Sequence, residues 1–397
     1  MPTSRRATIA DVAAASGVGV GTVSRVINGA ANVREATRAS VLKVIEQLGY
    51  RPSHLATSLS RGTPRTVAIV VPNLTRPSAV MRLAGALDVL DEQGYDTVVC
   101  NVVTPQQRDH HLAALTTRHR ADGVIVVSLR LSAAQLAAFR RVGVPLVTID
   151  AAATGVPQTL TDDVAGGRLA TGHLLALGHR RIGFVGDTMR GAAGVSRVGL
   201  GFIASQHRLT GYRQALAAAG VGHDPALVRR GPHGPANAEA LAAQLLALPD
   251  PPSAIFAASD IQAMGVLAAA DRLGISVPGD LSVIGFDDIE SAALLGLSTV
   301  RQPLAESGAE GARRLCALLR GERVSPLRLQ LALEVVQRSS TARRRAPGAG
   351  ARPPAGIAAG KAAARRAFAP FGAPLARPAA AAAARFCCAR QPGVNPF

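Results

Sequence analysis

Residues 8–28 read TIADVAAASGVGVGTVSRVIN, and their pattern predicts two short helices joined by a tight turn. Thr8 is a favourable N-cap, and Asp11 lies three residues on, where a capping-box carboxylate reaches back to the start of the helix. Gly17 supplies the left-handed backbone position at which a helix ends. Beyond Gly17, hydrophobic residues recur at helical spacing and predict a second helix with one buried side.

The second helix turns a largely polar side outward. Its buried side is predicted to consist of Val18, Val23, Val26 and Ile27. The outward side then consists of Val20, Gly21, Thr22, Ser24, Arg25 and Asn28. A helix, a glycine turn and a second helix make up the helix-turn-helix motif, whose second helix enters the major groove of DNA. The alternative is an ordinary helical hairpin.

The distribution of charge favours the DNA-binding interpretation. The chain has a formal charge of +18, and residues 1–65 carry nine basic and three acidic side chains. Residues 66–341 carry 25 basic and 23 acidic side chains, whereas residues 342–397 carry ten basic side chains and none that is acidic. A basic N-terminal module on a nearly neutral body is typical of a DNA-reading domain attached to a domain with another task.

Segments in order along residues 7–341 resemble the LacI/GalR family of bacterial transcription regulators. The N-terminal segments are ATIADVAAASGVGVGTVSRVIN, TRASVLKVIEQLGYRPSHLATSLSRG and TVAIVVPN. The later ones are LGHRRIGFVG (177–186), RLTGYRQAL (208–216), SVIGFDD (282–288) and TVRQP (299–303). The resemblance implies a helix-turn-helix, a third helix, a hinge helix and a core like that of sugar-binding proteins, with the ligand in a cleft between two lobes.

Beyond residue 66, short apolar segments alternate with segments of helical periodicity. Strands are predicted at 67–71, 97–103, 123–127, 145–149, 181–185, 253–257 and 281–286. Helices are predicted at 78–93, 105–118, 132–141, 163–177, 205–219, 236–248 and 260–273. Apolar strands with helical crossovers predict parallel sheets covered on both faces. The number of units predicts two lobes, 66–160 and 161–290, after which the chain returns across the hinge.

The fold class is therefore α/β, with an N-terminal all-α head and a bilobal, doubly wound parallel-sheet core. Residues 1–50 form the predicted helix-turn-helix head, and residues 51–65 form the hinge helix and linker. Residues 66–341 form the effector-binding and dimerisation core. Residues 342–397 are basic, low in complexity and rich in Pro and Gly, so they are predicted to be a disordered tail.

The resemblance places operator-reading positions at Val20, Gly21 and Arg25. Arg25 is the best physical candidate, because a guanidinium bonds both O6 and N7 of guanine. The alternative for Arg25 is a solvated surface charge. Thr22, Ser24 and Asn28 are expected to contact phosphates or to cap the helix, which positions the helix without reading sequence.

The resemblance also assigns a DNA contact to Leu59, within the hinge-like segment RPSHLATSL at 51–59. Family members insert the matching residue between base pairs in the minor groove, which kinks the DNA. A helix of about eight residues is marginal in water, so its folding is expected to depend on DNA and on a partner hinge. The alternative interpretation is a plain linker.

Asp150, Arg208 and Asp287 match family positions that line the effector cleft. Carboxylates accept hydrogen bonds from hydroxyl groups, and an arginine donates a planar fork, so this set suits a polyhydroxylated ligand. Three further residues complete the predicted effector-binding set, namely Asn73, Ser259 and Gln302. Asp260 and Asp288 are interpreted as helix caps, and the chain has no Trp to stack on a sugar ring.

Other classes of protein find little support in the sequence. No apolar segment reaches the length of about 18 residues that a membrane span needs, and the N-terminus lacks a signal segment. The four cysteines have no metal-binding or disulfide spacing, which fits a reducing cytoplasm; Cys100 is predicted to be a small core residue in a buried strand. No catalytic residues, metal site or cofactor are predicted.

These features predict a cytoplasmic homodimer that regulates transcription in response to a ligand, most simply a repressor of a carbohydrate-related operon. Its expected partners are pseudo-palindromic double-stranded operator DNA and a sugar or related polyol. The alternative is a solute-binding protein for transport, which shares the core architecture. An enzyme with a doubly wound fold is a third interpretation, for which no catalytic set is found.

Overall fold

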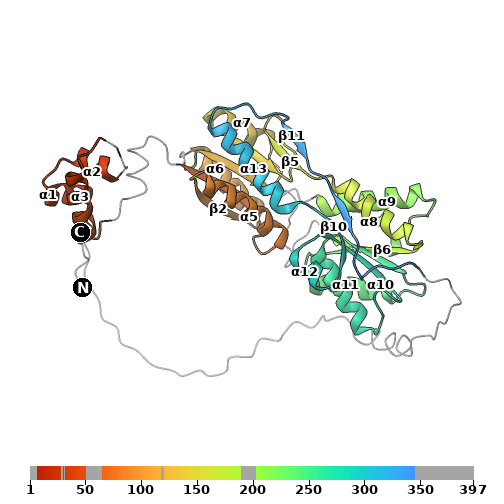
Figure 1. Cartoon of the computed structure of the whole chain (residues 1–397). Helices are drawn as coiled ribbons and strands as arrows, with labels where there is room; N and C mark the ends of the chain where they lie inside the picture. The colour runs from red at the N-terminus through yellow and green to blue at the C-terminus, as the bar shows by residue number, and fades with distance from the viewer. Residues whose placement is uncertain are drawn as a thin grey trace, which may run out of the picture.

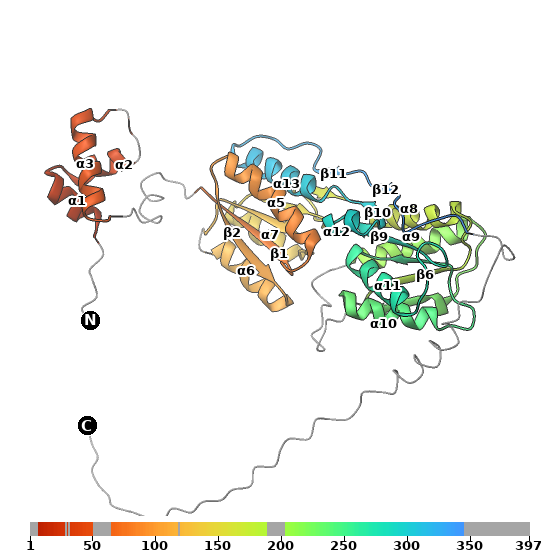
Figure 2. The ribbon, with the colours of Figure 1, turned by 60° about the horizontal axis from the view of Figure 1, so that its bottom comes forward.

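The computed structural model describes residues 7–27, 30, 32–50, 65–117, 120–188 and 203–344. They form a small helical head and a two-lobed core, as Figure 1 and Figure 2 show. Several predictions made from the sequence lie outside the described residues: the hinge helix with Leu59, the DNA contact Asn28 and the tail from residue 345 on.

The head confirms the predicted start and end of its first helix, α1 (Ile9–Ser16). The Asp11 carboxylate accepts a hydrogen bond from the Thr8 N–H over 2.8 Å, and Thr8 Oγ1 accepts one from the Asp11 N–H over 3.3 Å. The helix ends at Gly17, whose φ of +67° is left-handed. The two other helices of the head are α2 (Val20–Ile27) and α3 (Glu35–Gln47). Their common core consists of Val12, Ala13, Val23, Val26, Val41 and Tyr50.

The first lobe is a six-stranded parallel sheet with helices on both faces. Its strands follow the order β11-β5-β4-β3-β1-β2. Helices α5 and α13 cover one face, and α6 and α7 cover the other. Both faces of the central strands are therefore buried, which explains their continuous apolar sequence. The bounds are β1 (Thr66–Pro72), α5 (Pro77–Glu92), β2 (Asp96–Val102), α6 (Pro105–Thr117), β3 (Gly123–Val127), α7 (Ala133–Val142), β4 (Leu146–Ile149), β5 (Gln158–Leu160), α13 (Leu304–Leu319) and β11 (Arg328–Gln330).

The second lobe repeats this arrangement with the strand order β12-β10-β9-β8-β6-β7. All pairs are parallel except β10 with β12. Helices α10 and α11 cover one face, and α8 and α9 cover the other. The bounds are α8 (Asp163–Ala176), β6 (Ile182–Asp187), α9 (Ala204–Ala218), the 3-10 helix η2 (Pro225–Leu227), β7 (Val228–Gly231), α10 (Pro235–Leu246), β8 (Ala254–Ala257), α11 (Asp260–Arg272), β9 (Ser282–Asp287), α12 (Glu290–Leu294), β10 (Ser298–Arg301) and β12 (Glu334–Val336).

The chain passes between the lobes after β5, after β10 and after β11. The predicted return across the hinge is thus confirmed, because α13 packs in the first lobe although it follows the second lobe in sequence. Helix α13 crosses α5 at backbone contact distance. A Cβ atom on Gly85 would overlap the carbonyl of Ala305, and one on Gly308 would overlap the carbonyl of Arg82. Glycine at both positions therefore allows α13 to pack closely against α5, whose N-terminal end lines the cleft.

The predicted α/β fold class is confirmed, and every predicted strand and helix of the core is present. The prediction that Cys100 lies in a buried strand is wrong. Strand β2 is an edge strand, so only one side of it is paired, and Cys100 is half-buried while the neighbouring Val98 is 49% exposed. None of the helices in the described ranges is long and apolar enough to cross a membrane.

Candidate functional site

Strand ends place strained polar residues at the cleft between the lobes. Asn73, Ser128 and Asp150 directly follow β1, β3 and β4, and they have φ angles of +46°, +48° and +56°. Asp287 ends β9 with a φ of +116°. A left-handed conformation is strained for residues other than glycine, and such strain clusters at functional sites. In a parallel sheet the carboxyl ends of the strands also form the edge where ligands bind.

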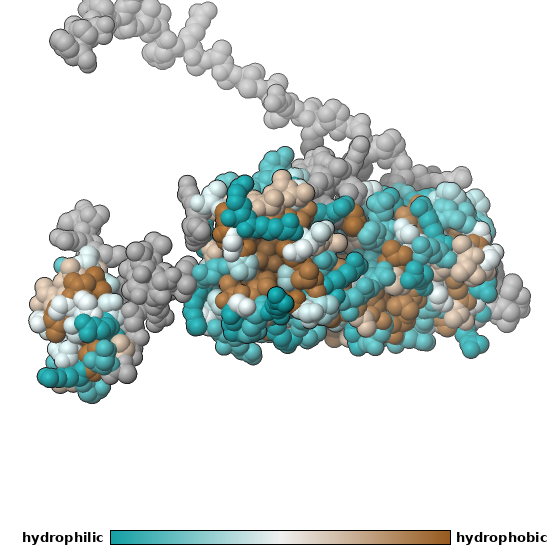
Figure 3. Space-filling model, turned by 90° about the horizontal axis from the view of Figure 1, so that it is seen from above, coloured by the Kyte–Doolittle hydropathy of each residue, from teal (hydrophilic) through white to brown (hydrophobic). Residues whose placement is uncertain are grey.

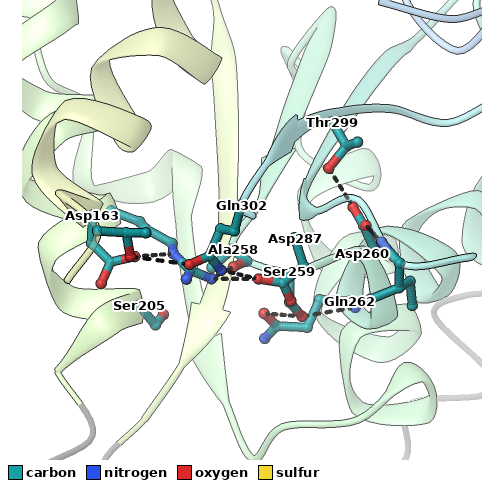
Figure 4. Close-up of polar contacts among 12 residues, drawn as sticks. Asp163, Ser205, Ala258, Ser259, Asp260, Gln262, Asp287, Thr299 and Gln302 are labelled. Atoms are coloured by element: carbon teal, nitrogen blue, oxygen red, sulfur yellow. Dashed lines mark hydrogen bonds and ion pairs between the residues drawn. The ribbon is translucent and has the colours of Figure 1, made fainter. Parts of the chain in front are cut away.

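The cleft is lined from both lobes by side chains that are mainly polar or charged. Figure 4 shows the part of this site that belongs to the second lobe and to the segment after β10. The lining residues are Pro72, Arg76, Ser78, Ala79, Arg82, Ser128, Asp150, Asp187, Thr188, Ala204, Ser205, Gln206, Arg208, Arg230, His233, Ala258, Ser259, Asp287 and Gln302. Such a surface favours a ligand that offers hydrogen-bonding groups on all sides.

Gln302 joins the two lobes at the point where the chain passes from β10 to α13. Its Nε2 donates a hydrogen bond to Asp287 Oδ1 over 2.6 Å. Its Oε1 accepts hydrogen bonds from Arg82 Nη2 and Thr161 Oγ1, each over 3.1 Å. Arg82 Nη2 also lies 3.3 Å from Asp150 Oδ2. Displacement of the Gln302 side chain would therefore break hydrogen bonds to side chains of both lobes.

Arg208 is held on all sides within the second lobe. Its Nε donates to Asp163 Oδ1 over 2.8 Å, and its Nη1 donates to the Ala258 carbonyl over 2.6 Å and lies 3.6 Å from Asp287 Oδ1. The guanidinium stacks 3.7 Å from the centre of the Phe286 ring. Burial raises the pKa of both carboxyl groups, and Arg208 opposes that shift. This fixed guanidinium is pre-organised to receive a ligand oxygen.

Five of the six predicted effector-binding residues line this one cleft: Asp150, Arg208, Ser259, Asp287 and Gln302. Asn73 is buried at the end of β1 and is not among the lining residues. Ser259 has a second role, because its hydroxyl accepts a hydrogen bond from the Gln262 N–H and caps α11. Binding of an effector by these six residues stays a prediction.

Sequence reasoning missed several lining residues, among them Arg76, Arg82, Ser128, Asp187 and His233. Two of them carried a signal. Ser128 follows the strand at 123–127 as Asn73 follows the strand at 67–71, and Arg82 is a charged residue on the otherwise apolar buried side of α5. His233 and Asp187 are brought to the cleft only by the pairing of β6 with β7.

The prediction that Asp260 and Asp288 cap helices is wrong, because Asp260 lies inside α11 and Ile289 is the N-cap residue of α12. Ser259 caps α11, and the buried Asp260 carboxylate instead accepts hydrogen bonds from the Ile289 N–H over 2.9 Å and from Thr299 Oγ1 over 2.6 Å (Figure 4). Burial, with a smaller contribution from Asp287, raises the pKa of Asp260 to about 7. Asp288 forms ion pairs with two arginines, Arg301 at 2.6 Å and Arg338 at 2.8 Å.

The head presents the predicted reading surface on α2. Val20 is 45% exposed, and Gly21 and Arg25 are exposed, while Thr22 and Ser24 are half-buried. Arg25 Nε donates to the Gly21 carbonyl over 3.2 Å, so the side chain lies back along its own helix. Outward residues of this kind on a second helix have the placement that major-groove recognition requires.

Comparison with known proteins identifies the family. Residues 8–53 match the family described as bacterial regulatory proteins, lacI family, and residues 171–341 match a periplasmic binding protein-like domain. The HTH-type transcriptional regulator DegA of Bacillus subtilis is 31% identical over 344 residues, which cover 85% of this chain and 98% of DegA. CelR of Thermobifida fusca is 34% identical over 348 residues, covering 85% and 98%. The chain belongs to the LacI family.

Solved structures of the LacI family share the fold of this member. A CelR–cellobiose complex is 33% identical with a TM-score of 0.59, and the match covers 84% of this chain and all of that one. A lac repressor dimer bound to operator and the anti-inducer ONPF is 26% identical with a TM-score of 0.71, covering 85% of this chain and all of that one. The LacI-family relatives named here are transcriptional regulators, and this chain belongs to the same class of DNA-binding regulator.

Proposed function

We propose that this LacI-family chain is a repressor that binds operator DNA as a homodimer. Its affinity for the operator changes when a small polyhydroxylated effector binds in the cleft. The observation that carries the proposal is the joint presence, in one chain, of an outward reading surface on α2 and a polar cleft between two lobes. The four divisions at 1–50, 51–65, 66–341 and 342–397 are part of this proposal.

Operator reading is assigned to Arg25, supported by its exposure on α2 and by the match of residues 8–53 to the family. In the free protein its Nε bonds the Gly21 carbonyl, and on DNA the side chain would leave this bond to take a guanine. Val20 and Gly21 would face a thymine methyl or give clearance. Thr22, Ser24 and Asn28 are assigned to phosphate contacts, and Leu59 is assigned to the minor groove. The assignments of Asn28 and Leu59 rest on the sequence alone, because both lie outside the described residues.

The effector site is assigned to Asp150, Arg208, Ser259, Asp287 and Gln302, with Asn73 beside them. CelR, a relative of 33% identity in a solved structure, holds cellobiose, which supports a sugar or related polyol as the effector class here. The hydrogen bonds from Gln302 to both lobes support a change in lobe arrangement when a ligand competes for them.

The homodimer is supported by apolar side chains exposed on elements of both lobes. Leu294 of α12 is 84% exposed and the next residue, Leu295, is 49% exposed. Val98 on the edge strand β2 is 49% exposed, and Val80 on α5 is 46% exposed. Figure 3 shows one face of the molecule, where hydrophobic residues are exposed over both lobes. Exposed apolar groups of this number favour burial against a second copy.

The alternative, a solute-binding protein for transport, predicts a ligand but no DNA affinity. The test is selection of bound duplexes from a random DNA library by the purified chain, followed by titration of the enriched duplex and of a scrambled one. A repressor enriches a pseudo-palindrome and binds it far more tightly than the scrambled duplex. Failure to enrich any sequence, with a sugar still raising the melting temperature, would favour the transport alternative.

A further inference from the structure

The cleft is unusual in what its lining lacks. Among the described residues that line it, there is no Phe, Tyr, Trp, Leu, Ile or Val, and the apolar contribution comes from Pro72 and three alanines. Sugar rings commonly present an apolar face to an aromatic side chain, and the described residues of the lining offer no such platform. The described lining therefore favours a ligand that is recognised by charge and hydrogen bonds.

The first-lobe side of the cleft is the N-terminal end of α5, a helix of 16 residues. Arg76 occupies the N-cap, and no side chain caps the helix there. Ser78 and Ala79, in the first turn, also line the cleft. Pro77 has no N–H and the Ala79 N–H donates to the Arg76 carbonyl over 3.0 Å, so the Ser78 N–H and the helix dipole are what favour an anion at this helix start.

Arg82, one turn further along α5, is an independent sign of an anionic ligand. Its side chain is 4% exposed, it lines the cleft, and its Nε is a buried donor without a hydrogen-bond partner. The Nδ2 of Asn73, at the start of the same β1–α5 connection, is a second buried donor without a partner. Buried donors are nearly always paired in folded proteins, so the unpaired Nε of Arg82, a residue that lines the cleft, points to an acceptor that the ligand supplies.

The charges around the cleft agree with this. The lining contains four arginines, Arg76, Arg82, Arg208 and Arg230, and three aspartates, Asp150, Asp187 and Asp287. Arg208 contacts two carboxylates of its own, Asp163 and Asp287. Arg82 contacts a single one, Asp150, which Ser128 Oγ also bonds over 2.7 Å. Arg76 Nη2 lies 3.9 Å from Asp187 Oδ2, so each of the two arginines at the start of α5 contacts one carboxylate, against two for Arg208.

We propose that the effector is an acidic polyol, a sugar acid or a sugar phosphate, whose carboxylate or phosphate lies at the start of α5 against Arg82 and Ser78. This rests on the proposed function, since it names the ligand class of the same cleft. Asp287 and Asp150 accept hydrogen bonds from the hydroxyl groups, while Arg82 binds the acid group. An arginine is suited to either anion, because its planar fork matches both.

The test uses the full chain and four probes at one ionic strength set with chloride: inorganic phosphate, D-gluconate, D-glucose 6-phosphate and neutral D-glucitol. Phosphate and at least one of the two acids are expected to raise the melting temperature by about 2 °C or more, and glucitol is not. Gluconate and glucose 6-phosphate separate a carboxylate site from a phosphate site. A rise with phosphate alone would overturn the sugar-acid class.

Two variants place the effect at α5. Arg82→Gln and Ser78→Asp are both expected to abolish the rise, and Arg272→Gln, which breaks an exposed ion pair with Glu239, is expected to keep it. Ser78→Asp tests the site even if Arg82→Gln is unstable. A carboxylate in the first turn stabilises the helix, but it repels an anionic ligand. A rise of equal size in both cleft variants, or none in the unmodified chain, overturns the proposal. Operator binding without probes is measured alongside, so failure of the anion site alone is distinguished from failure of the regulator assignment.

Discussion

Arg82 and Gln302 connect the two lobes across the cleft, with Nη2 of the arginine donating to Oε1 of the glutamine over 3.1 Å. Arg82 belongs to α5, whose strand β1 directly follows the linker from the head, and Gln302 follows β10 of the second lobe. The same glutamine bonds Asp287. A ligand that competes for these bonds would act on the first helix that follows the linker in sequence, which gives a physical route from effector to operator.

Removing the link is expected to destabilise the core. In Gln302→Leu, Asp287 loses its amide donor and Arg82 loses an acceptor, and each buried group left unpaired costs about 1–3 kcal/mol. Urea unfolding should show a lower midpoint with an unchanged slope. The control is Gln330→Leu on the exposed strand β11, which is expected to change stability little. Equal stability of the two variants would mean that water replaces the lost partners.

Asp260 makes stability depend on pH with a definite sign. The folded protein holds this proton up to about pH 7, whereas an unperturbed aspartate releases it near 3.8. The folded state therefore binds more protons in this window, and the free energy of unfolding falls as pH rises through it, by about 4 kcal/mol at most. Asp260→Asn should remove this part of the slope and be more stable than the unmodified chain at pH 8. Asp271→Asn, on the exposed end of the same helix, should retain the slope.

The crossing of α5 and α13 is expected to tolerate no side chain at Gly308. An added Cβ would overlap the carbonyl of Arg82, so Gly308→Ala forces the helices apart and costs about 1–3 kcal/mol. Gly172→Ala in α8, where a Cβ meets nothing within 4 Å, should gain up to about 1 kcal/mol from helix propensity. Thermal melts of the two variants measure the contrast. Destabilisation by both would point to a general effect of losing glycine.

Self-association is expected to depend on α12. Leu294→Asp places a charge where the proposed partner copy would bury an apolar side chain, and it should shift the dimer toward monomer in sedimentation equilibrium. The control is Leu327→Asp, because Leu327 is likewise an exposed leucine, at 48%, but lies between α13 and β11. Loss of the dimer in the control, or its retention in Leu294→Asp, would place the interface elsewhere.

The regular part of the fold could be predicted from the sequence, because strands buried on both faces have an unbroken apolar sequence. The runs at 67–71 and 123–127 are examples, and both became central strands. Strand β2 is also rich in Val but lies at the edge of the sheet, because strand order depends on contacts far apart in sequence. Short elements such as β5 and α12 carry too few residues to show a period.

The candidate site was predictable where a residue follows a recognisable strand or matches a family motif, as Asp150 and Asp287 do. Arg82 was missed because a charge within a helical pattern is ordinarily on the solvent side, and its partners Asp150 and Gln302 lie 68 and 220 residues away in sequence. Asp260 was misread as a cap for a similar reason. Its partners Ile289 and Thr299 are 29 and 39 residues away, and no local pattern joins them.

Reading of a specific DNA sequence by α2 is the property on which the proposed function depends. The most direct measurement is the ratio of dissociation constants for a scrambled and an enriched duplex, taken for the unmodified chain and for Arg25→Ala at several salt concentrations. We expect a ratio of at least about 10³ for the unmodified chain. Arg25→Ala should lose about 1–3 kcal/mol on the enriched duplex and bind the scrambled one as before. A ratio near one for the unmodified chain, or an equal loss on both duplexes in Arg25→Ala, would contradict it.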